Sequence, residues 1–346
     1  NVGGWYSEPQ LENYSGFYYQ YHYPKPDDIV TEQQGYIINY IDNFEQVIIN
    51  ENSSDSISGY ANIINWYSFV DFLIMQEIAK NVDGYRLSNY MYKDNDSNDG
   101  RLVAGPIWDF NLGFGNADYY EGWDTQGWQV DAILPSDDFG NPFWWSLIWS
   151  DENFRWSVQQ RWYELRQNML SNSAVNTVID SLQDHIGVAA DRNFERWSTL
   201  GEYVWPNYFI GETYEEEVEY LRDWIMTRME WMDNELLATH GNTYLVPEAF
   251  ALNPVFPNPF NRSASIRYLL PMYTEIKLDV FDAKGVHIYR LFEGGKHAGV
   301  HTLSWDGKNN YGQDVSSGMY IILLEANNLQ YNRHHYTETR KIIMVK

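Results

Sequence analysis

Residues 77–115 read EIAKNVDGYRLSNYMYKDNDSNDGRLVAGPIWDFNLGFG, and this stretch decides how the first part of the chain folds. A turn signal at 81–85 is followed by a strand-like run at 89–92, a polar tip at 94–100 and a second strand-like run at 101–107. Two short strand-like runs around a polar, glycine-containing tip are typical of a β-hairpin. The stretch therefore predicts the end of a helix, a turn and a two-stranded ribbon, in that order.

Three polar side chains lie around this predicted hairpin. Asp83 is in the turn before it, Asp109 follows its second strand, and Asn89 lies between them. Because a hairpin brings its two ends together, the two carboxylates are expected to be neighbours. Kinase-type phosphoryl transfer uses such a set: one Asp accepts the proton of the acceptor hydroxyl, while an Asn and a second Asp hold Mg²⁺. The alternative is a pair of solvated or capping carboxylates in loops.

The spacing of these groups matches a protein kinase site loosely. The catalytic Asp and the Asn of ordinary protein kinases are about five positions apart, whereas Asp83 and Asn89 are six apart. The run that begins at Asp109 reads DFN, where the kinase motif reads DFG. Arg86 and Lys93 are close enough in the sequence to reach a phosphate, although a surface ion pair is the simpler explanation for each.

The rest of the first 246 residues is predicted to be mostly helical. Apolar residues recur at helical spacing in three stretches, 31–48, 61–80 and 142 to about 238. Capping-box pairs mark two helix starts, Thr31 with Gln34 and Thr213 with Glu216.

After Pro247 the sequence period changes from helical to alternating. Apolar and more polar residues alternate over 276–281, and Gly, Asn and Asp turns separate further short strands. Such short, regularly spaced strands predict a β-sandwich, with Trp305 in its core. We therefore expect an α+β chain, with a mostly helical domain that contains a β-hairpin at 1–246 and an all-β sandwich at 247–346.

The charge of the chain is unevenly distributed. Residues 1–246 hold 12 Lys and Arg against 39 Asp and Glu, whereas residues 247–346 hold 11 against 9. This contrast supports a boundary between two domains. A first domain this negative repels nucleic acid and anionic membranes. No stretch approaches the roughly 18 apolar residues of a membrane helix. We therefore expect no nucleic-acid partner and no membrane span.

Several segments of the first domain share their pattern with one known family: 23–25, 33–44, 69–72, 77–90, 93–94 and 105–115. Through the last four of them, residues 62–117 resemble the core of the CotH kinase family, the atypical kinases first named from spore coat proteins, and the two earlier segments also fit this family. The resemblance implies a kinase-like C-lobe in which Asp83 is the catalytic residue and Asp109 binds metal. With Asn89 as a second metal ligand, the expected cofactors are Mg²⁺ and ATP, and Asn89, Arg86 and Lys93 are the candidate cofactor-binding residues.

A kinase also needs a cation that grips the phosphates of the nucleotide. Before Asp83 the chain contains Lys25 and Lys80 and no Arg, and neither Lys lies on a strand after a Gly-rich loop. The chain begins with Asn1 rather than Met, so we expect a fragment or processed form that lacks the N-lobe. The 346-residue chain by itself is therefore expected to transfer no phosphate.

A second resemblance covers roughly 252–346. It is carried by 258–261, 265–271, 280–285, 298–301, 305–307, 317–320 and 341–346. These segments resemble the sorting domain of type IX secretion substrates, and the module also resembles the Ig-like domain of flagellar hook-capping proteins. The resemblance implies an Ig-like sandwich recognised by the type IX secretion machinery, and a secreted or cell-surface location reached by outer-membrane export. The alternative is a plain structural or carbohydrate-binding sandwich.

Two functions from different classes follow from these observations. The first is an exported CotH-type kinase that phosphorylates Ser or Thr of a surface or extracellular protein, whose identity the sequence does not give. The second is a non-catalytic cell-surface or scaffold protein that retains the kinase-like fold. A nucleotide-gripping Lys and a phosphate loop in a longer gene product would favour the enzyme, and their absence there would favour the scaffold.

Overall fold

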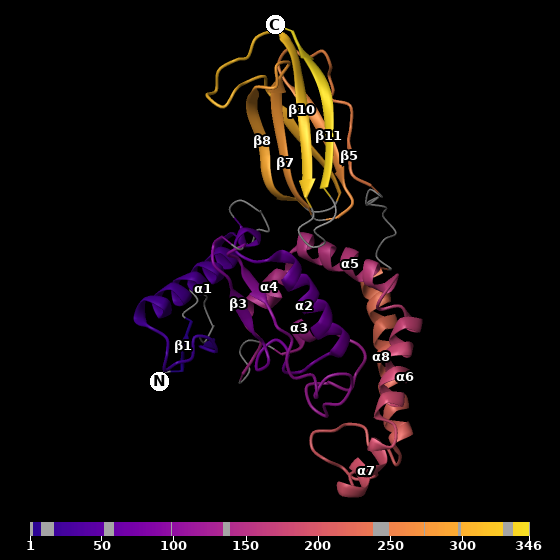
Figure 1. Ribbon diagram of the computed structural model, residues 1–346. Coiled ribbons are helices and arrows are strands. Elements are labelled where there is room, and N and C mark those ends of the chain that lie inside the picture. Colours follow the sequence, from indigo (N-terminus) through magenta and orange to yellow (C-terminus); the bar gives the residue numbers. More distant parts are fainter. Residues whose placement is uncertain are drawn as a thin grey trace. The chain divides into compact units, whose positions relative to one another are not determined.

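The computed structural model describes residues 3–7, 17–51, 59–97, 99–133, 139–237, 249–272, 274–296, 299–327 and 335–345. The chain divides into two compact units, Asn1–Thr239 and His240–Lys346 (Figure 1). The boundary expected between residues 246 and 247 falls outside the described residues.

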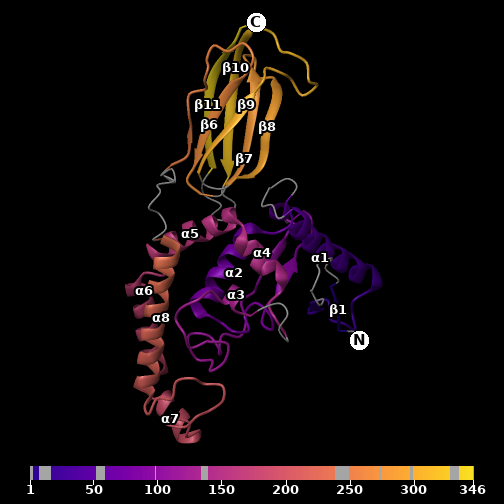
Figure 2. The ribbon, with the colours of Figure 1, turned by 180° about the vertical axis from the view of Figure 1, so that it is seen from behind.

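The first unit is mostly helical and contains two small antiparallel hairpins, which pair β1 with β2 and β3 with β4. In both views α6 runs alongside α8 (Figures 1 and 2). The elements are β1 (Gly4–Tyr6), β2 (Tyr18–Gln20), α1 (Thr31–Glu51), the 3-10 turn η1 (Tyr60–Asn62), α2 (Trp66–Ala79), β3 (Met91–Lys93), β4 (Leu102–Ala104), α3 (Gln129–Ala132), α4 (Phe143–Ser150), α5 (Glu152–Arg166), α6 (Asn172–Ile186), α7 (Ala189–Arg196) and α8 (Tyr214–Leu237).

Helix α2 is the central helix of this unit, because apolar residues cover nearly all of its surface. Ten of its 14 residues are buried, and α5, α8 and β4 pack against it. Aromatic rings fill the surrounding space: Phe72 stacks on Trp145 with 5.5 Å between ring centroids, and Trp144 and Trp145 are fully buried. This packing fixes the point at which the chain leaves α2 and enters the candidate site.

The helix starts differ in detail from the predictions. Helix α1 begins at Thr31, but the side chain that closes its first turn is Gln33, whose Oε1 accepts from the Val30 amide at 3.1 Å. The second helix starts later than predicted, at Trp66, because Asn65 caps it and the residues before form η1 instead. Asx side chains compete for backbone amides in this way at helix ends.

The predicted hairpin is present but short. Strands β3 and β4 pair over three residue pairs, from Met91↔Ala104 to Lys93↔Leu102. The second strand ends at Ala104 because Gly105 has a φ of 120° and Pro106 has no amide hydrogen to donate. Among the helices of the described residues, none has a stretch of the length and apolar character that spans a bilayer.

The second unit is all-β and antiparallel. Its strands form two sheets, in the orders β11-β10-β7-β8 and β5-β6-β9. The buried residues of both sheets form one core, in which Trp305 is fully buried. The α+β prediction, a helical domain with a hairpin followed by a β-sandwich, is therefore confirmed. The strands are β5 (Ala251–Leu252), β6 (Ala264–Leu270), β7 (Thr274–Asp282), β8 (His287–Lys296), β9 (Gly299–Trp305), β10 (Gly318–Asn327) and β11 (His335–Met344).

Candidate functional site

The candidate site begins where α2 ends. Lys80 closes the helix in the left-handed conformation, with φ 43° and ψ 48°, and its amide donates to the carbonyls of Gln76 and Glu77. A left-handed residue other than glycine costs on the order of 1 kcal/mol, so the surrounding contacts must hold it. This bend directs the chain into Asn81 and Asp83.

Asn81 joins the two ends of the hairpin. Its side chain is fully buried. Its Nδ2 donates to the Asp109 carbonyl at 3.1 Å, and its Oδ1 accepts from the Asp83 amide at 3.2 Å. The two segments that carry the candidate carboxylates therefore meet at one amide group. No catalytic motif in the sequence includes Asn81, although an Asn two residues before a turn residue is a typical Asx-turn signal.

The segment after Asp109 also packs on the end of α2. Asp109 is itself left-handed, with a φ of 60°. The Phe114 amide donates to the Ala79 carbonyl at 2.6 Å. A Cβ at Gly113 would lie 3.2 Å from the Ala79 Cβ, which leaves no free space between the two segments. The position of Asp109 thus depends on α2 as well as on the hairpin.

The Asp83 carboxylate is paired with Arg86. The distance from Arg86 Nη2 to Asp83 Oδ1 is 2.7 Å, and the two side chains are 6% and 18% exposed, respectively. The other guanidinium nitrogens donate to protein carbonyls, Nε to Val82 at 3.0 Å and Nη1 to Phe139 at 3.1 Å. The structure therefore places Arg86, a candidate phosphate ligand, on Asp83 itself.

Asn89 keeps one acceptor free. Its Nδ2 donates to the Tyr85 carbonyl at 3.1 Å. Its Oδ1 is buried and has no hydrogen-bond partner among the described residues. A buried polar atom without a partner costs about 1–3 kcal/mol. A cation or a water bound at this oxygen would offset that cost.

Lys93 is engaged with α1 and the hairpin tip. Its Nζ pairs with Asp96 at 2.8 Å and lies 5.4 and 5.2 Å from the ring centroids of Tyr36 and Tyr40. Both tyrosines belong to α1. These contacts direct the ammonium to α1 rather than to the Asp83 turn, so we leave Lys93 out of the site proposed below.

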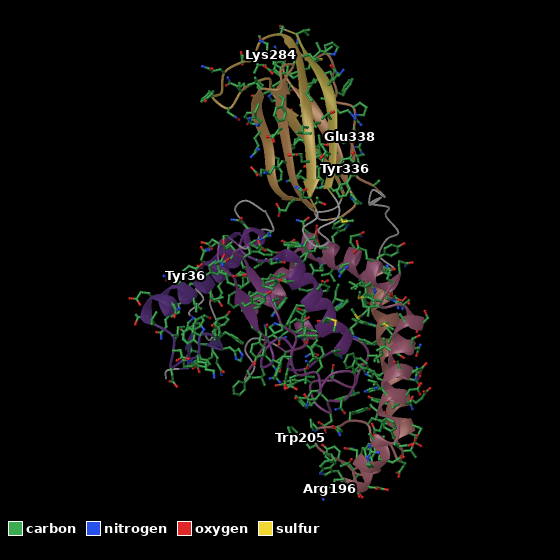
Figure 3. The ribbon with its side chains drawn as sticks, in the orientation of Figure 1. Tyr36, Arg196, Trp205, Lys284, Tyr336 and Glu338 are labelled. Atoms are coloured by element: carbon green, nitrogen blue, oxygen red, sulfur yellow. The ribbon has the colours of Figure 1, made fainter. Side chains whose placement is uncertain are left out.

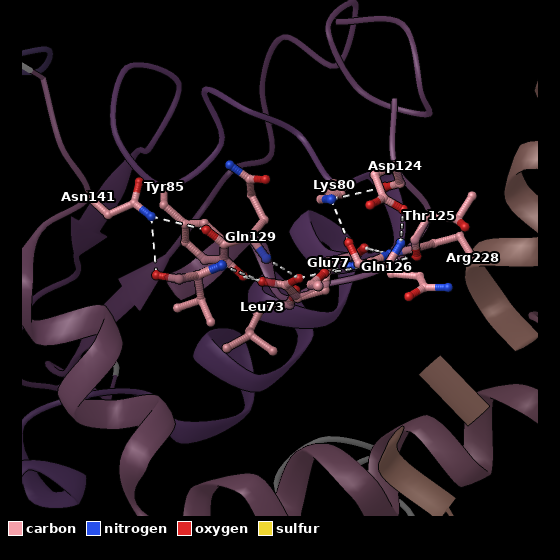
Figure 4. Close-up of polar contacts among 12 residues, drawn as sticks. Leu73, Glu77, Lys80, Tyr85, Asp124, Thr125, Gln126, Gln129, Asn141 and Arg228 are labelled. Carbon is pink, nitrogen blue, oxygen red and sulfur yellow. Dashed lines mark hydrogen bonds and ion pairs between the residues drawn. The ribbon is translucent and has the colours of Figure 1, made fainter. Parts of the chain in front are cut away.

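A buried network lies next to the turn (Figure 4). Glu77 and Arg228 are both fully buried, and Arg228 Nη2 lies 3.0 Å from Glu77 Oε2. The Glu77 carboxylate also accepts from the Tyr85 hydroxyl and from the amides of Gln129 and Val130, each at 2.8 Å. Burial raises the pKa of Glu77, and the Arg228 charge and these donors oppose that rise.

The same network anchors the loop at 124–127. Arg228 Nη1 donates to two loop carbonyls at 2.8 Å, and Lys80 Nζ donates to two more at 3.0 and 2.6 Å. Burial lowers the pKa of the Lys80 ammonium. Lys80 therefore serves the loop rather than facing a ligand. The four acceptors are the carbonyls of Thr125, Gly127, Asp124 and Gln126.

An aromatic turn lies against Asp83 and Arg86. The Tyr120 ring centroid is 5.0 Å from Arg86 Cζ. Burial, followed by the nearby Asp83 charge, raises the pKa of Tyr119. Trp205, in the segment between α7 and α8 (Figure 3), is 71% exposed and stacks on Tyr119 with 6.3 Å between ring centroids. The aromatic-rich composition did not indicate these positions, because ring-rich segments are more often core.

The chemistry of these residues fits Mg²⁺. This ion prefers oxygen ligands, keeps several waters and is usually held by one or two carboxylates together with substrate phosphates. Asp109 would offer a carboxylate and the unpartnered Oδ1 of Asn89 an amide oxygen, whereas the Asp83 carboxylate is already paired with Arg86. Within the described ranges, no three His, Cys, Asp or Glu side chains converge as a metal cage would require.

Solved structures match this chain with low TM-scores. Latent PorU from Porphyromonas gingivalis is 18% identical over 29% of this chain and 10% of its own, with a TM-score of 0.25. FlgD from P. aeruginosa is 25% identical over 24% and 60%, with a TM-score of 0.19. PorZ of P. gingivalis, a surface component of the type-IX secretion system, is 14% identical over 28% and 12%, with a TM-score of 0.19. This chain thus spans about a tenth of PorU and PorZ. No curated protein matches it.

Two family models match the chain. Residues 262–330 match the FlgD Ig-like domain, which agrees with the β-sandwich of the second unit. Residues 7–232 match the CotH kinase protein model. This match covers more than half of the chain and includes both candidate carboxylates. The chain therefore belongs to the CotH kinase protein family.

Proposed function

We propose that the chain is part of an exported CotH-type protein kinase, which transfers a phosphoryl group from ATP to a Ser or Thr hydroxyl of a surface or extracellular protein. The observation that supports this is the buried side-chain amide of Asn81, which hydrogen-bonds to the backbones of both Asp83 and Asp109. Membership of the CotH family supplies the reaction class.

Each residue of the proposed site has a separate role. Asp83 accepts the proton of the acceptor hydroxyl as the phosphoryl group is transferred, a contribution worth about 10²- to 10⁴-fold in rate. Asp109 and the unpartnered Oδ1 of Asn89 would hold Mg²⁺. When bound, Mg²⁺ neutralises phosphate charge. Asn81 touches none of the reacting groups and keeps the two acidic segments in register.

The cation that grips the nucleotide is a separate requirement. The sequence of residues 1–82 contains two lysines, Lys25 and Lys80, and no arginine. Lys80 is bound to two loop carbonyls. We therefore assign neither lysine to the nucleotide phosphates. We predict that the 346-residue chain alone transfers no phosphate.

The test compares the full-length gene product with the 346-residue chain, using labelled ATP, Mg²⁺ and a panel of Ser and Thr peptides. The full-length protein should transfer label, and Asp83→Asn should lower its kcat about 10²- to 10⁴-fold. Asp109→Asn should raise the Mg²⁺ concentration needed for half-maximal rate. Asp96→Asn, at the exposed hairpin tip, is the matched control and should leave the rate unchanged. A full-length Asp83→Asn protein that transfers at the parent rate would overturn the assignment.

A second function is favoured by one specific observation. Cations near the site have protein partners: Lys80 binds loop carbonyls, Arg86 binds Asp83 and Lys93 binds Asp96. A scaffold that keeps the kinase-like fold for adhesion or matrix assembly needs no free phosphate ligand. Full-length protein that shows neither label transfer nor a thermal shift with Mg²⁺ and ATP would support this alternative.

We also propose that the β-sandwich is the export address. Its match to the FlgD Ig-like domain supports a module of the kind that the type IX secretion machinery recognises, which would make the protein secreted or surface-bound. Deletion of residues 252–346 should keep the protein inside the cell. If the shortened protein still reached the medium or the cell surface, this part of the proposal would fail.

A further inference from the structure

We infer that Arg86 and Tyr120 are positioning residues that fix the direction of the Asp83 carboxylate, an inference that rests on the proposed role of Asp83. All three guanidinium nitrogens of Arg86 donate to protein acceptors: Nε to Val82, Nη1 to Phe139 and Nη2 to Asp83. The Arg86 side chain is 6% exposed. An arginine that binds phosphate presents paired N–H groups to its ligand. Here protein oxygens engage each of the three nitrogens.

The Tyr120 ring restrains the guanidinium in the remaining direction. The three hydrogen bonds act through the nitrogens, whereas the ring contacts the group at 5.0 Å from Cζ to centroid, within the range of a cation–π interaction. Arg86 is thus bound by carbonyls, a carboxylate and a ring. A guanidinium held in this way can fix the carboxylate oxygen that it pairs with.

The turn that presents Tyr120 is strained and closely packed. Tyr120 and Glu121 are consecutive left-handed residues, with φ values of 47° and 53°, a conformation unfavourable for side chains other than glycine. A Cβ at Gly122 would lie 2.8 Å from the Ala117 Cβ and 3.0 Å from Val82 Cγ1. The turn therefore touches the residue that directly precedes Asp83. Strain that persists in this way must be held by the contacts around it.

A second segment holds the turn from outside. Ala117 and Asn207 form an antiparallel bridge, the Asp118 amide donates to the Pro206 carbonyl at 2.9 Å, and Trp205 stacks near it on Tyr119. The chain between α7 and α8 thus supports the turn. The Asp83 carboxylate depends in consequence on residues more than a hundred positions away.

The first test measures hydrogen exchange on the 346-residue chain and needs no enzymatic activity. The amides of Arg86, Leu87 and Ser88 donate to the Asp83 carbonyl at 3.2, 3.0 and 2.9 Å, so their exchange reports the Asp83 turn. Tyr120→Gly removes the ring and relieves the left-handed backbone. It should speed exchange of these amides about threefold to fivefold while the Tm stays within about 3 °C of the parent.

Two further variants complete this test. Tyr120→Phe keeps a ring over the guanidinium and should exchange like the parent chain. Arg86→Met loses the pair and its hydrogen bonds and should exchange about tenfold faster or more. Unchanged exchange in Tyr120→Gly would overturn the inference. So would acceleration of the same size in the amides of α5 and α8, because it would mean general loosening of the unit.

The second test uses Arg86→Lys in the full-length protein. A positioning role predicts a kcat that falls about tenfold or more, a KM for ATP within about twofold of the parent and an altered pH profile. A raised KM for ATP with unchanged kcat would instead make Arg86 a phosphate ligand and would overturn the inference. If the full-length parent transferred no phosphate, the proposed function would fail, and the exchange experiment would still decide whether Arg86 and Tyr120 hold the turn.

Discussion

Replacing Arg228 with Met would remove a guanidinium that binds four oxygens inside the first unit. Its Nε and Nη2 bind the carbonyl and the carboxylate of Glu77, and its Nη1 binds the carbonyls of Thr125 and Gly127. Arg228 and Glu77 are both fully buried. Methionine has a similar length and no donor, so the space stays largely filled while the charge and the hydrogen bonds are lost.

The expected cost follows from what is left behind. A buried charge that loses its partner costs about 3–5 kcal/mol. Glu77 keeps its bonds from Tyr85 and two amides, which favours the lower part of that range. We therefore expect the unfolding free energy of this unit to fall by about 3–4 kcal/mol. Adding Glu77→Gln removes the unpaired charge and should return about 1–2 kcal/mol of that loss.

Urea unfolding followed by tryptophan fluorescence measures this effect. Fourteen of the 15 tryptophans precede residue 240, so the signal reports mainly the first unit. Arg222→Met on the same helix is the matched control, because Arg222 pairs with the 63%-exposed Asp180 and should cost less than about 1 kcal/mol. A loss under about 1 kcal/mol for Arg228→Met, or a double variant less stable than the single one, would refute the reasoning.

Three further outcomes are expected from the same chain. Burial raises the pKa of Glu45 to about 7, so the folded state favours the protonated carboxyl. The contribution of this group to the stability of the first unit should be greatest below about pH 4.5 and fall by up to about 3 kcal/mol toward pH 7. Urea unfolding at several pH values should show this dependence in the parent chain and not in Glu45→Gln. Asn81→Ala removes the amide that joins Asp83 and Asp109 and should cost about 1–3 kcal/mol by urea unfolding, with faster hydrogen exchange around both residues. Trp305→Ala should destabilise the β-sandwich by about 3–5 kcal/mol and leave the unfolding of the first unit unchanged in calorimetry.

Periodicity and capping signals predicted most of the elements because they act locally. The Thr213 hydroxyl accepts from the Glu216 amide at 3.2 Å at the start of α8, as its spacing predicts. Alternation predicted strand β7, but Asp279, expected on the polar face, is 4% exposed. It is buried because Arg290 and His287 cover its carboxylate. These two side chains belong to the neighbouring strand β8, so the alternation within β7 alone could not predict that Asp279 is buried.

The approach of the two acidic segments was predictable from the sequence, whereas the contacts that support it were not. Hairpin closure predicted that the segments of Asp83 and Asp109 meet, because that depends on the order of elements. The roles of Asn81, Arg86 and Tyr120 depend on which side chains fill the space between those segments. That space is set by left-handed turns and by contacts distant in sequence, which no short motif specifies.

The charges around the site limit how it could bind a nucleotide. The first 246 residues hold 39 acidic against 12 basic side chains, and the cations nearest in sequence to Asp83 serve internal contacts. Lys80 holds the 124–127 loop and Arg86 holds the proposed base. An anionic surface attracts Mg²⁺ and repels free ATP, so any nucleotide bound here must arrive with its charge already neutralised. If the proposed function holds, ATP binding should therefore depend steeply on the Mg²⁺ concentration, because these side chains leave the phosphate charge unpaired.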